Sequence, residues 1–201
     1  MTEREYLCPV KKIAIFASGA GSNAERIVDH FHSTKQGVAE VVLVACNKPG
    51  AGVLSIAAKN NIPSLVIDKE RFFRGGAYIA ILKEAGIDLI VLAGFLWKIP
   101  PALVNEFPGR IINIHPALLP NYGGKGMYGR HVHQAVLDNK EKESGITIHS
   151  VDEIYDNGAI IFQTTCPVLE TDNPEELERR IRLLELEHYP RVIEELIKGA
   201  M

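Results

Sequence analysis

The stretch RIINIHPALLP, residues 110–120, is followed directly by the glycine-containing segment NYGG at 121–124. An apolar run that ends in polar residues, a proline and glycines is typical of a buried strand that leads into a loop. In open α/β sheets, ligands bind beyond the carboxyl ends of the strands. The stretch therefore predicts a strand of an α/β sheet, and it predicts a ligand site at the end of that strand.

Asn113 and His115 lie two residues apart in this stretch. Because successive side chains of a strand alternate between its faces, both should point the same way, about 6–7 Å apart. An amide can donate a hydrogen bond to a developing oxyanion, and an imidazole changes its protonation near neutral pH. The pair therefore suits acyl transfer. A polar strand end with a hydrogen-bonded core histidine is the structural alternative, and the pair alone does not decide between them.

The composition is that of an ordinary globular protein. With 201 residues, of which 46% are hydrophobic and 23% charged, the chain is expected to form a single domain over residues 1–201, with a flexible N-terminal extension at 1–11. The net charge of −3 gives no basic surface for nucleic acid or for a membrane, so small-molecule substrates are favoured. The first residues show no signal peptide, which predicts a cytoplasmic protein. We expect a monomer or a weak homodimer.

The cysteines indicate neither disulfide bonds nor a metal site. Cys8, Cys46 and Cys166 are odd in number and far apart, so neither a disulfide pattern nor a zinc site is indicated, and free thiols are expected, those of Cys46 and Cys166 within strands. His131 and His133 open a predicted helix, but residues two apart do not share a helix face, which disfavours a zinc pair. No metal is expected.

Apolar runs alternate with helical patterns along most of the chain, which predicts a parallel sheet covered by helices on both faces, a Rossmann-like three-layer α/β sandwich. The last two strands have the spacing of a hairpin, so the sheet should become mixed near the C-terminus. A final helix begins at Asn173-Pro174 with a capping box, and Pro190 should break or kink it before a second helix at 191–198. The expected strands are 12–17, 41–46, 64–68, 87–95, 110–115, 144–151 and 159–163, and the expected helices before the final one are 24–31, 52–60, 76–85, 101–106 and 131–139.

The segment SGAGSN, residues 18–23, stands between the first predicted strand and the first predicted helix. Glycines permit close backbone approach to an anion, and the amides at a helix start complete a phosphate cradle. A nicotinamide dinucleotide site is disfavoured, because the next strand ends in Asn47-Lys48 without the acid that would hold a ribose. A phosphate-bearing substrate, with Ser22 and Asn23 as added donors, is favoured over a purely structural turn.

The most apolar strand, 87–95, should be central and ends in LWKIPP at 96–101. Trp97, in the segment after this strand, could help to bind an aromatic or apolar ligand, or it could simply pack in the core. The glycine-dense loop at 125–130 should lie near the site. One acid of the turn at 152–158 could be carried over the cleft of Asn113 and His115, although most acids in turns face water.

The chain resembles the phosphoribosylglycinamide formyltransferases from Ile13 to about Ile197. The resemblance rests on SGAGSN (18–23), VLAGF (91–95), NIHPALLP (113–120) and Asp156 with Gly158. It implies the formyltransferase fold and an enzyme of purine biosynthesis. The implied reaction moves the formyl group of the cosubstrate 10-formyltetrahydrofolate to the amine of 5'-phosphoribosylglycinamide, without a metal.

The resemblance also implies roles for individual residues. Ala117 departs from the family's usual serine, Asn157 from a glycine and Trp97 from a basic residue, and the loop at 125–130 differs from bacterial forms. The implied catalytic residues are Asn113, His115 and Asp156; the implied substrate-binding residues are Gly21, Ser22 and Asn23; and the implied folate-binding residues are Leu96, Trp97, Lys98, Ile99, Asn113 and Arg74.

Other functions stay open. A formyltetrahydrofolate deformylase, a hydrolase, uses a related trio but lets water attack, and its known forms carry an extra regulatory domain. Methionyl-tRNA formyltransferase also shares the trio, yet it adds a tRNA-binding domain and would be more basic. A non-catalytic nucleotide-phosphate-binding module would explain the glycine loop but not Asn113, His115 and Asp156 together.

Overall fold

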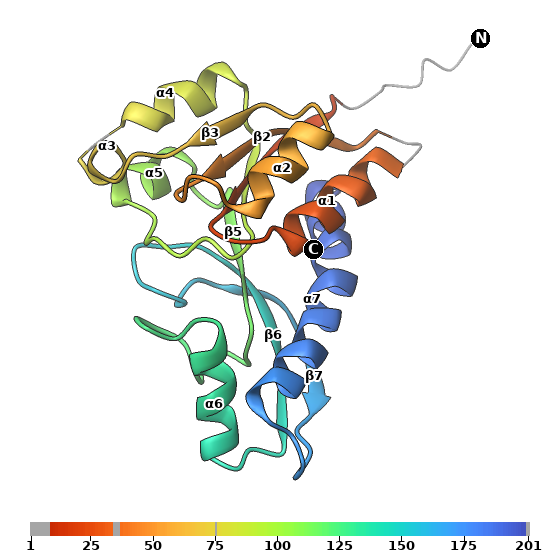
Figure 1. The fold of residues 1–201 in the computed structure, drawn as a ribbon. Coiled ribbons are helices and arrows are strands. Elements are labelled where there is room, and N and C mark those ends of the chain that lie inside the picture. The colour runs from red at the N-terminus through yellow and green to blue at the C-terminus, as the bar shows by residue number, and fades with distance from the viewer. Residues whose placement is uncertain (1–8, 34–36, 75, 200–201) are drawn as a thin grey trace.

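The computed structural model describes residues 9–33, 37–74 and 76–199 (Figure 1). Cys8 and residues 1–8 of the expected N-terminal extension lie outside this range, and Lys11 is already the first residue of β1. The strands are β1 (Lys11–Ala17), β2 (Ala39–Cys46), β3 (Ser64–Val66), β4 (Leu89–Leu92), β5 (Ile111–His115), β6 (Glu143–Ser150) and β7 (Ile160–Pro167). The helices are α1 (Ser22–Ser33), α2 (Gly52–Lys59), α3 (Lys69–Phe73), α4 (Ala77–Glu84), α5 (Pro101–Glu106), α6 (Arg130–Asp138) and α7 (Pro174–Ile197).

Within the described residues, the strands form one seven-stranded sheet in the order β3-β2-β1-β4-β5-β6-β7. The pairs from β3 to β5 are parallel, whereas β6 runs antiparallel to both β5 and β7. Long crossovers through helices are needed for the parallel pairs, and a short connection suffices for the antiparallel ones. The predicted parallel sheet that becomes mixed near the C-terminus is confirmed.

Side chains of each central strand alternate between two hydrophobic clusters. In β1, Ile13 and Ile15 pack into a cluster with residues of α1, α2 and α7, whereas Ala14 and Phe16 pack into a second cluster with residues of α3, α4 and α5. Figure 1 shows α1, α2 and α7 on one side of the sheet and α3 to α5 on the other. The expected three-layer sandwich is therefore confirmed, and its two cores are separated by the sheet.

The final helix differs from the prediction. α7 runs without interruption from Pro174 to Ile197 and contains Pro190, so the predicted break is wrong. A proline lacks the N–H that would donate to the carbonyl of the residue four positions earlier, Leu186. Arg26 of α1 donates to that carbonyl oxygen instead, with Nε at 3.3 Å. The neighbouring helix therefore satisfies the backbone group that the proline leaves open.

Two further boundaries differ. β4 ends at Leu92, three residues before the end expected for the strand at 87–95. α3, which the sequence did not indicate, follows Asp68, and the Asp68 side chain caps this helix by accepting a hydrogen bond from the backbone N–H of Arg71 at 2.9 Å. A residue assigned to the end of the third strand thus begins a helix, because a short aspartate side chain favours an N-cap over a strand.

Candidate active site

Three predicted site segments lie at or beyond the carboxyl ends of three neighbouring strands. The glycine loop at 18–23 follows β1, the segment at 96–99 lies beyond β4, and Asn113 and His115 lie in the last part of β5. β1, β4 and β5 are adjacent and parallel, so their carboxyl ends share one edge of the sheet. The order of the strands reverses between β1 and β4, which is where open α/β sheets form a crevice for ligands.

The glycine loop has a conformation that requires Gly21. Its φ is +88°, and a Cβ at this position would lie 2.9 Å from the Cα of Val53 in α2. Ser22 then begins α1, whose first backbone N–H groups have no acceptor within the helix. Amides of this kind bind anions well. The conformation is compatible with the predicted phosphate site.

Ser18 connects this loop to the segment beyond β4. Its backbone N–H donates to the carbonyl of Gly94 at 3.1 Å, and its Oγ accepts a hydrogen bond from the backbone N–H of Leu96 at 2.9 Å. Ser18 is buried. The predicted phosphate loop and the predicted folate segment are therefore held together by a buried side chain.

Asn23, in the first turn of α1, contacts α7. Its Nδ2 donates to Oε2 of Glu185 at 2.8 Å, while its buried Oδ1 has no partner among the described residues. Burial raises the pKa of the Glu185 carboxyl, and the hydrogen bond from Asn23 lowers it by less. Sequence reasoning missed Glu185, because one acid among many in a long charged helix carries no signal of its own.

A pocket lies beside Asn113 and encloses about 440 Å³, including the open space at its mouth. The indole of Trp97 lines it and packs against Phe72 and Phe73 of α3, with ring centroids 5.9 and 5.7 Å apart. The residues around the pocket are Leu92, Phe95, Trp97, Lys98, Ile99, Asn113, His149, Val151, Asp152, Ile154, Tyr155 and Asp156.

Most of the predicted folate-binding residues border this pocket, and two do not. Leu96 is exposed and is not part of the pocket wall. Arg74 caps the C-terminal end of α3, where its exposed guanidinium pairs with Glu70 at 2.5 Å. The structure therefore does not bring Arg74 to the pocket, because its helix presents it to solvent next to an acid of the preceding turn.

The predicted catalytic trio is brought together. Oδ2 of Asp156 lies 3.7 Å from Nδ1 of His115 and accepts a hydrogen bond from the backbone N–H of Gly124 at 2.9 Å. The other ring nitrogen of His115, Nε2, donates to the carbonyl oxygen of Tyr122 at 2.7 Å. Asn113 and Asp156 line the pocket, and the buried His115 contacts Asp156. Asp156 is thus the acid of its turn that faces the strand end.

The turn that carries Asp156 has a special backbone. Asp156 itself has a φ of +52°, in the left-handed region that aspartate tolerates better than most residues. A Cβ on Gly158 would lie 1.8 Å from the carbonyl oxygen of Ser150, so the chain passes against the end of β6 at a distance that only glycine allows. This close passage accounts for the glycine at position 158.

His149 is a further residue of the site, and sequence reasoning gave it no role. It stands directly opposite Asn113 in the antiparallel pair of β5 and β6, and its Nε2 lies 3.1 Å from Nδ2 of Asn113. The same Nε2 is 3.7 Å from Oδ1 of Asp156. Polar residues at alternate positions of the predicted strand, Thr147 and His149, were a possible signal, but the sequence does not give the register of the pair.

Two further histidines that the sequence singled out, His131 and His133, lie in α6. His133 is buried, and this burial lowers its pKa, whereas His131 is exposed and its ring stands edge-on to Tyr128 with centroids 5.8 Å apart. Among the described residues, no group of three or more His, Cys, Asp or Glu side chains is placed to hold a metal ion. Cys46 and Cys166 are free and buried in β2 and β7, as predicted.

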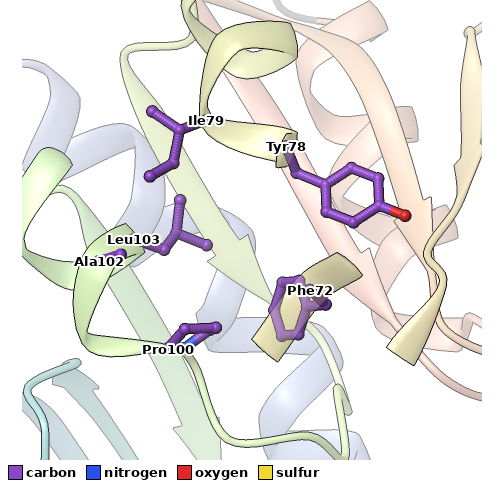
Figure 2. Close-up of a pocket in the computed structure, with 6 residues that line it drawn as sticks. All are labelled: Phe72, Tyr78, Ile79, Pro100, Ala102 and Leu103. Carbon is purple, nitrogen blue, oxygen red and sulfur yellow. The ribbon is translucent and has the colours of Figure 1, made fainter. Parts of the chain in front are cut away.

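A second, smaller pocket is apolar. It lies between α3, α4 and α5, spans about 220 Å³ including the open space at its mouth, and is shown in Figure 2. The hydroxyl of Tyr78 points away from Leu103 in this view and accepts a hydrogen bond from the backbone N–H of Asp68 at 2.8 Å. This pocket offers no group for acyl transfer. In the described part of the chain, moreover, no helix has the length and apolar character needed to cross a membrane.

The seven-stranded sheet, parallel at first and antiparallel in its last strands, is that of the formyltransferase fold, and the chain belongs to the formyl transferase family, which it matches over residues 11–193. It is 43% identical over 189 residues to the chloroplastic phosphoribosylglycinamide formyltransferase of Arabidopsis thaliana, covering 91% of this chain and 64% of that protein. It is 38% identical to the phosphoribosylglycinamide formyltransferase of Bacillus subtilis, covering 94% of this chain and 95% of that one.

A solved structure is also similar. The crystal structure of phosphoribosylglycinamide formyltransferase from Bacillus halodurans has a TM-score of 0.84 and 38% identity, covering 95% of this chain and 97% of that chain. The chain spans less than two thirds of the length of the first plant and insect relatives that it matches. The predicted resemblance to this family is confirmed.

Proposed function

We propose that this chain transfers the formyl group of 10-formyltetrahydrofolate to the amine of 5'-phosphoribosylglycinamide, as a folate-dependent enzyme of de novo purine biosynthesis. The observation that supports this best is the arrangement at the sheet edge. A pocket bordered by Trp97 and the glycine loop at 18–23 lie beyond neighbouring strands and are connected through Ser18. Asn113 and Asp156 stand at the wall of that pocket.

The pocket suits the pterin end of a folate. Its wall combines apolar and aromatic side chains with a few polar groups, as small-molecule sites do. Phe95, Trp97 and Ile154 offer apolar surface to a flat ring, and Asp152 offers a hydrogen-bond acceptor at the same wall. Backbone groups of the segment at 96–99 add further polar contacts. The phosphate of the acceptor would then bind at Gly21, Ser22 and Asn23.

The residues present can perform the transfer. The amine attacks the formyl carbon, a C–N bond forms, and negative charge grows on the formyl oxygen. Asn113 donates a hydrogen bond to that oxygen, and protonated His115 adds positive charge nearby. Asp156 pairs with this imidazolium, since its Oδ2 lies 3.7 Å from His115 Nδ1.

The protons balance without a further reactant. The attacking amine loses one proton, which Asp156 accepts directly or through a water. The bond between the formyl carbon and the folate nitrogen breaks, and that nitrogen receives one proton as it leaves. His115 and Asp156 together can hold the proton between these two events, which is general acid–base catalysis. The folate supplies the activated one-carbon unit.

A deformylase is the second candidate, because it would use the same trio with water in place of the amine. The glycine loop favours the transferase, since a helix start with free amides is suited to a phosphate monoester. Incubation with 10-formyltetrahydrofolate alone should give slow loss of the formyl group. Addition of 5'-phosphoribosylglycinamide should accelerate this loss strongly, with formylated ribonucleotide formed in equal amount.

Ser22→Ala tests the acceptor site. It should raise the Michaelis constant for the ribonucleotide more than that for the folate, because it removes binding at the remote phosphate end. Ser33→Ala, at the opposite end of α1, is the matched control and should change neither constant. Rapid deformylation that ignores the ribonucleotide would make the chain a hydrolase, and inactivity with both substrates would return it to a binding module. A cytoplasmic location and a monomeric or weakly dimeric state stay predictions.

A further inference from the structure

We infer that His149 is a positioning residue which holds the side-chain amide of Asn113 with its nitrogen, and not its oxygen, available to the formyl oxygen. This inference rests on the proposed function, because it concerns the oxyanion donor of that reaction. It assigns a task to a buried histidine that the trio of Asn113, His115 and Asp156 does not include.

The strand pairing places the two side chains together. Asn113 of β5 and His149 of β6 are directly opposite in an antiparallel pair, so both project from the same face of the sheet. Nε2 of His149 lies 3.1 Å from Nδ2 of Asn113, within hydrogen-bond distance. Both residues line the pocket. His149 is buried, with 2% of its surface exposed, so water does not compete readily for this contact.

The chemistry of the other ring nitrogen fixes the direction of this hydrogen bond. Nδ1 of His149 lies 2.8 Å from the carbonyl oxygen of Ser150, and a carbonyl oxygen can only accept. Nδ1 must therefore carry a hydrogen. In the neutral ring Nε2 then has a lone pair and can only accept, so the Asn113 group that faces it must be the NH₂. The orientation of the amide thus follows from hydrogen-bond chemistry.

The charged and titratable groups around His149 are Asp156, His115 and Asp152. Burial lowers the pKa of His149 most strongly, and His115 lowers it further, whereas the Ser150 carbonyl, Asp156 and Asp152 raise it by less. The net lowering favours the neutral ring near neutral pH. Asp156 stands 3.7 Å from Nε2, which is longer than the contact from Asn113.

This orientation matters for catalysis. An amide has two N–H groups, and His149 uses one, which leaves the second for a ligand in the pocket. If the amide turned by half a rotation, its oxygen would take the place of the nitrogen and would repel a developing oxyanion. The role of His149 is to exclude that second orientation before substrate binds, so that the donor is preorganised.

Two substitutions separate the two contacts of the ring. In the His149→Gln variant, the side-chain amide lies near the position of Nε2, and its oxygen can accept a hydrogen bond from Asn113. In the His149→Asn variant, the shorter side chain reaches only the position of Nδ1. It can therefore keep the hydrogen bond to Ser150, but it loses the one to Asn113. The expected cost of His149→Asn in kcat is about tenfold to a hundredfold, below the roughly 10²–10³ for loss of an oxyanion donor outright. The Michaelis constants should change little, and His149→Gln should restore most of the lost turnover.

A double mutant tests whether His149 acts through Asn113. In the Asn113→Ala background, His149→Asn should cost little more, because the group that it positions is absent. A purely structural histidine would instead give the same loss in both backgrounds and would not distinguish glutamine from asparagine. Either of those results in an enzyme whose parent form transfers formyl groups would overturn the inference.

A second measurement does not depend on activity. Nitrogen-15 NMR of the unmodified protein near neutral pH should show His149 with a protonated Nδ1 and an unprotonated Nε2. A protonated Nε2 would overturn the inference even if every variant failed to fold. If the parent protein shows this tautomer but transfers no formyl group, the proposed function fails, and the positioning of the Asn113 amide remains as a structural finding.

Discussion

Asn113 and Asp156 reach one pocket from different parts of the chain, a strand and a turn. Asn113→Ala removes the oxyanion donor, so turnover should fall by about 10²–10³. Asp156→Asn should also be nearly inactive, because it removes the base and the partner of the imidazolium. The double variant should lose much less than the product of the single losses, since the residues act as a unit.

Initial rates at saturating substrate would measure these losses, and urea unfolding would show that the variants fold. Asp29→Asn, on the exposed face of α1, is a control that should keep the parent turnover. Near-full activity of Asp156→Asn across the pH range would show that Asp156 is only a loop residue.

The direction of a side chain could be predicted from the sequence where the local geometry of a strand determines it. Asn113 and His115 could be placed on one face because a strand alternates strictly. His149 could not be recognised, since its importance depends on the register of β5 against β6, which no local pattern encodes. Arg74 was assigned to the folate by resemblance alone, and the helix that turns it to solvent was not visible in the sequence.

The long helix α7 covers one face of the sheet and contacts the glycine loop through the hydrogen bond between Glu185 and Asn23. Its N-terminus has a full capping box: Asn173 accepts from the backbone N–H of Glu176 at 2.9 Å, and the Glu176 carboxylate accepts from the backbone N–H of Asn173 at 3.1 Å. This cap was predicted from sequence, since it depends on residues three positions apart.

Asn173→Ala should lower the free energy of unfolding by about 1 kcal/mol, the usual cost of a lost N-cap. Urea denaturation would measure the change. Glu187→Ala, an exposed substitution within the same helix, should change it by less than about 0.5 kcal/mol. Equal effects of the two substitutions would mean that the cap contributes nothing.

The uninterrupted course of α7 through Pro190 was not predictable from the sequence, because the side chain that donates to the carbonyl oxygen of Leu186, Arg26, comes from another helix.

For the whole molecule, alternation of strand and helix patterns was enough to predict the sandwich, because a parallel sheet requires a crossover between each pair of strands. The meeting of the site segments follows from that architecture. What the alternation could not give is the path of the turn at 152–158, where Asp156 meets His115 and Gly124. Turns are fixed by tertiary contacts more than by propensity.

Acid should destabilise the whole fold. Burial lowers the pKa of both His133 and His149, so the folded state favours their neutral forms. Their stabilising contribution is complete above the unfolded pKa of about 6.5 and is lost as pH falls through the lower folded pKa. The raised pKa of Glu185 acts in the opposite direction, because protonation favours the folded state there.

The free energy of unfolding in urea should therefore be smaller at about pH 5 than at about pH 8. His133→Gln removes one of the titrating groups and should make that difference smaller. An unchanged pH dependence in this variant would show that His133 does not contribute.

The sequence contains one tryptophan, and Trp97 stands in the wall of the pocket. The tryptophan fluorescence of this chain is therefore the emission of a single reporter at the proposed folate site. A ligand that enters the pocket should shift or quench that emission, whereas a phosphate ester held at the glycine loop would do so only indirectly, through the Ser18 contact. The two binding steps could thus be followed separately in the unlabelled protein.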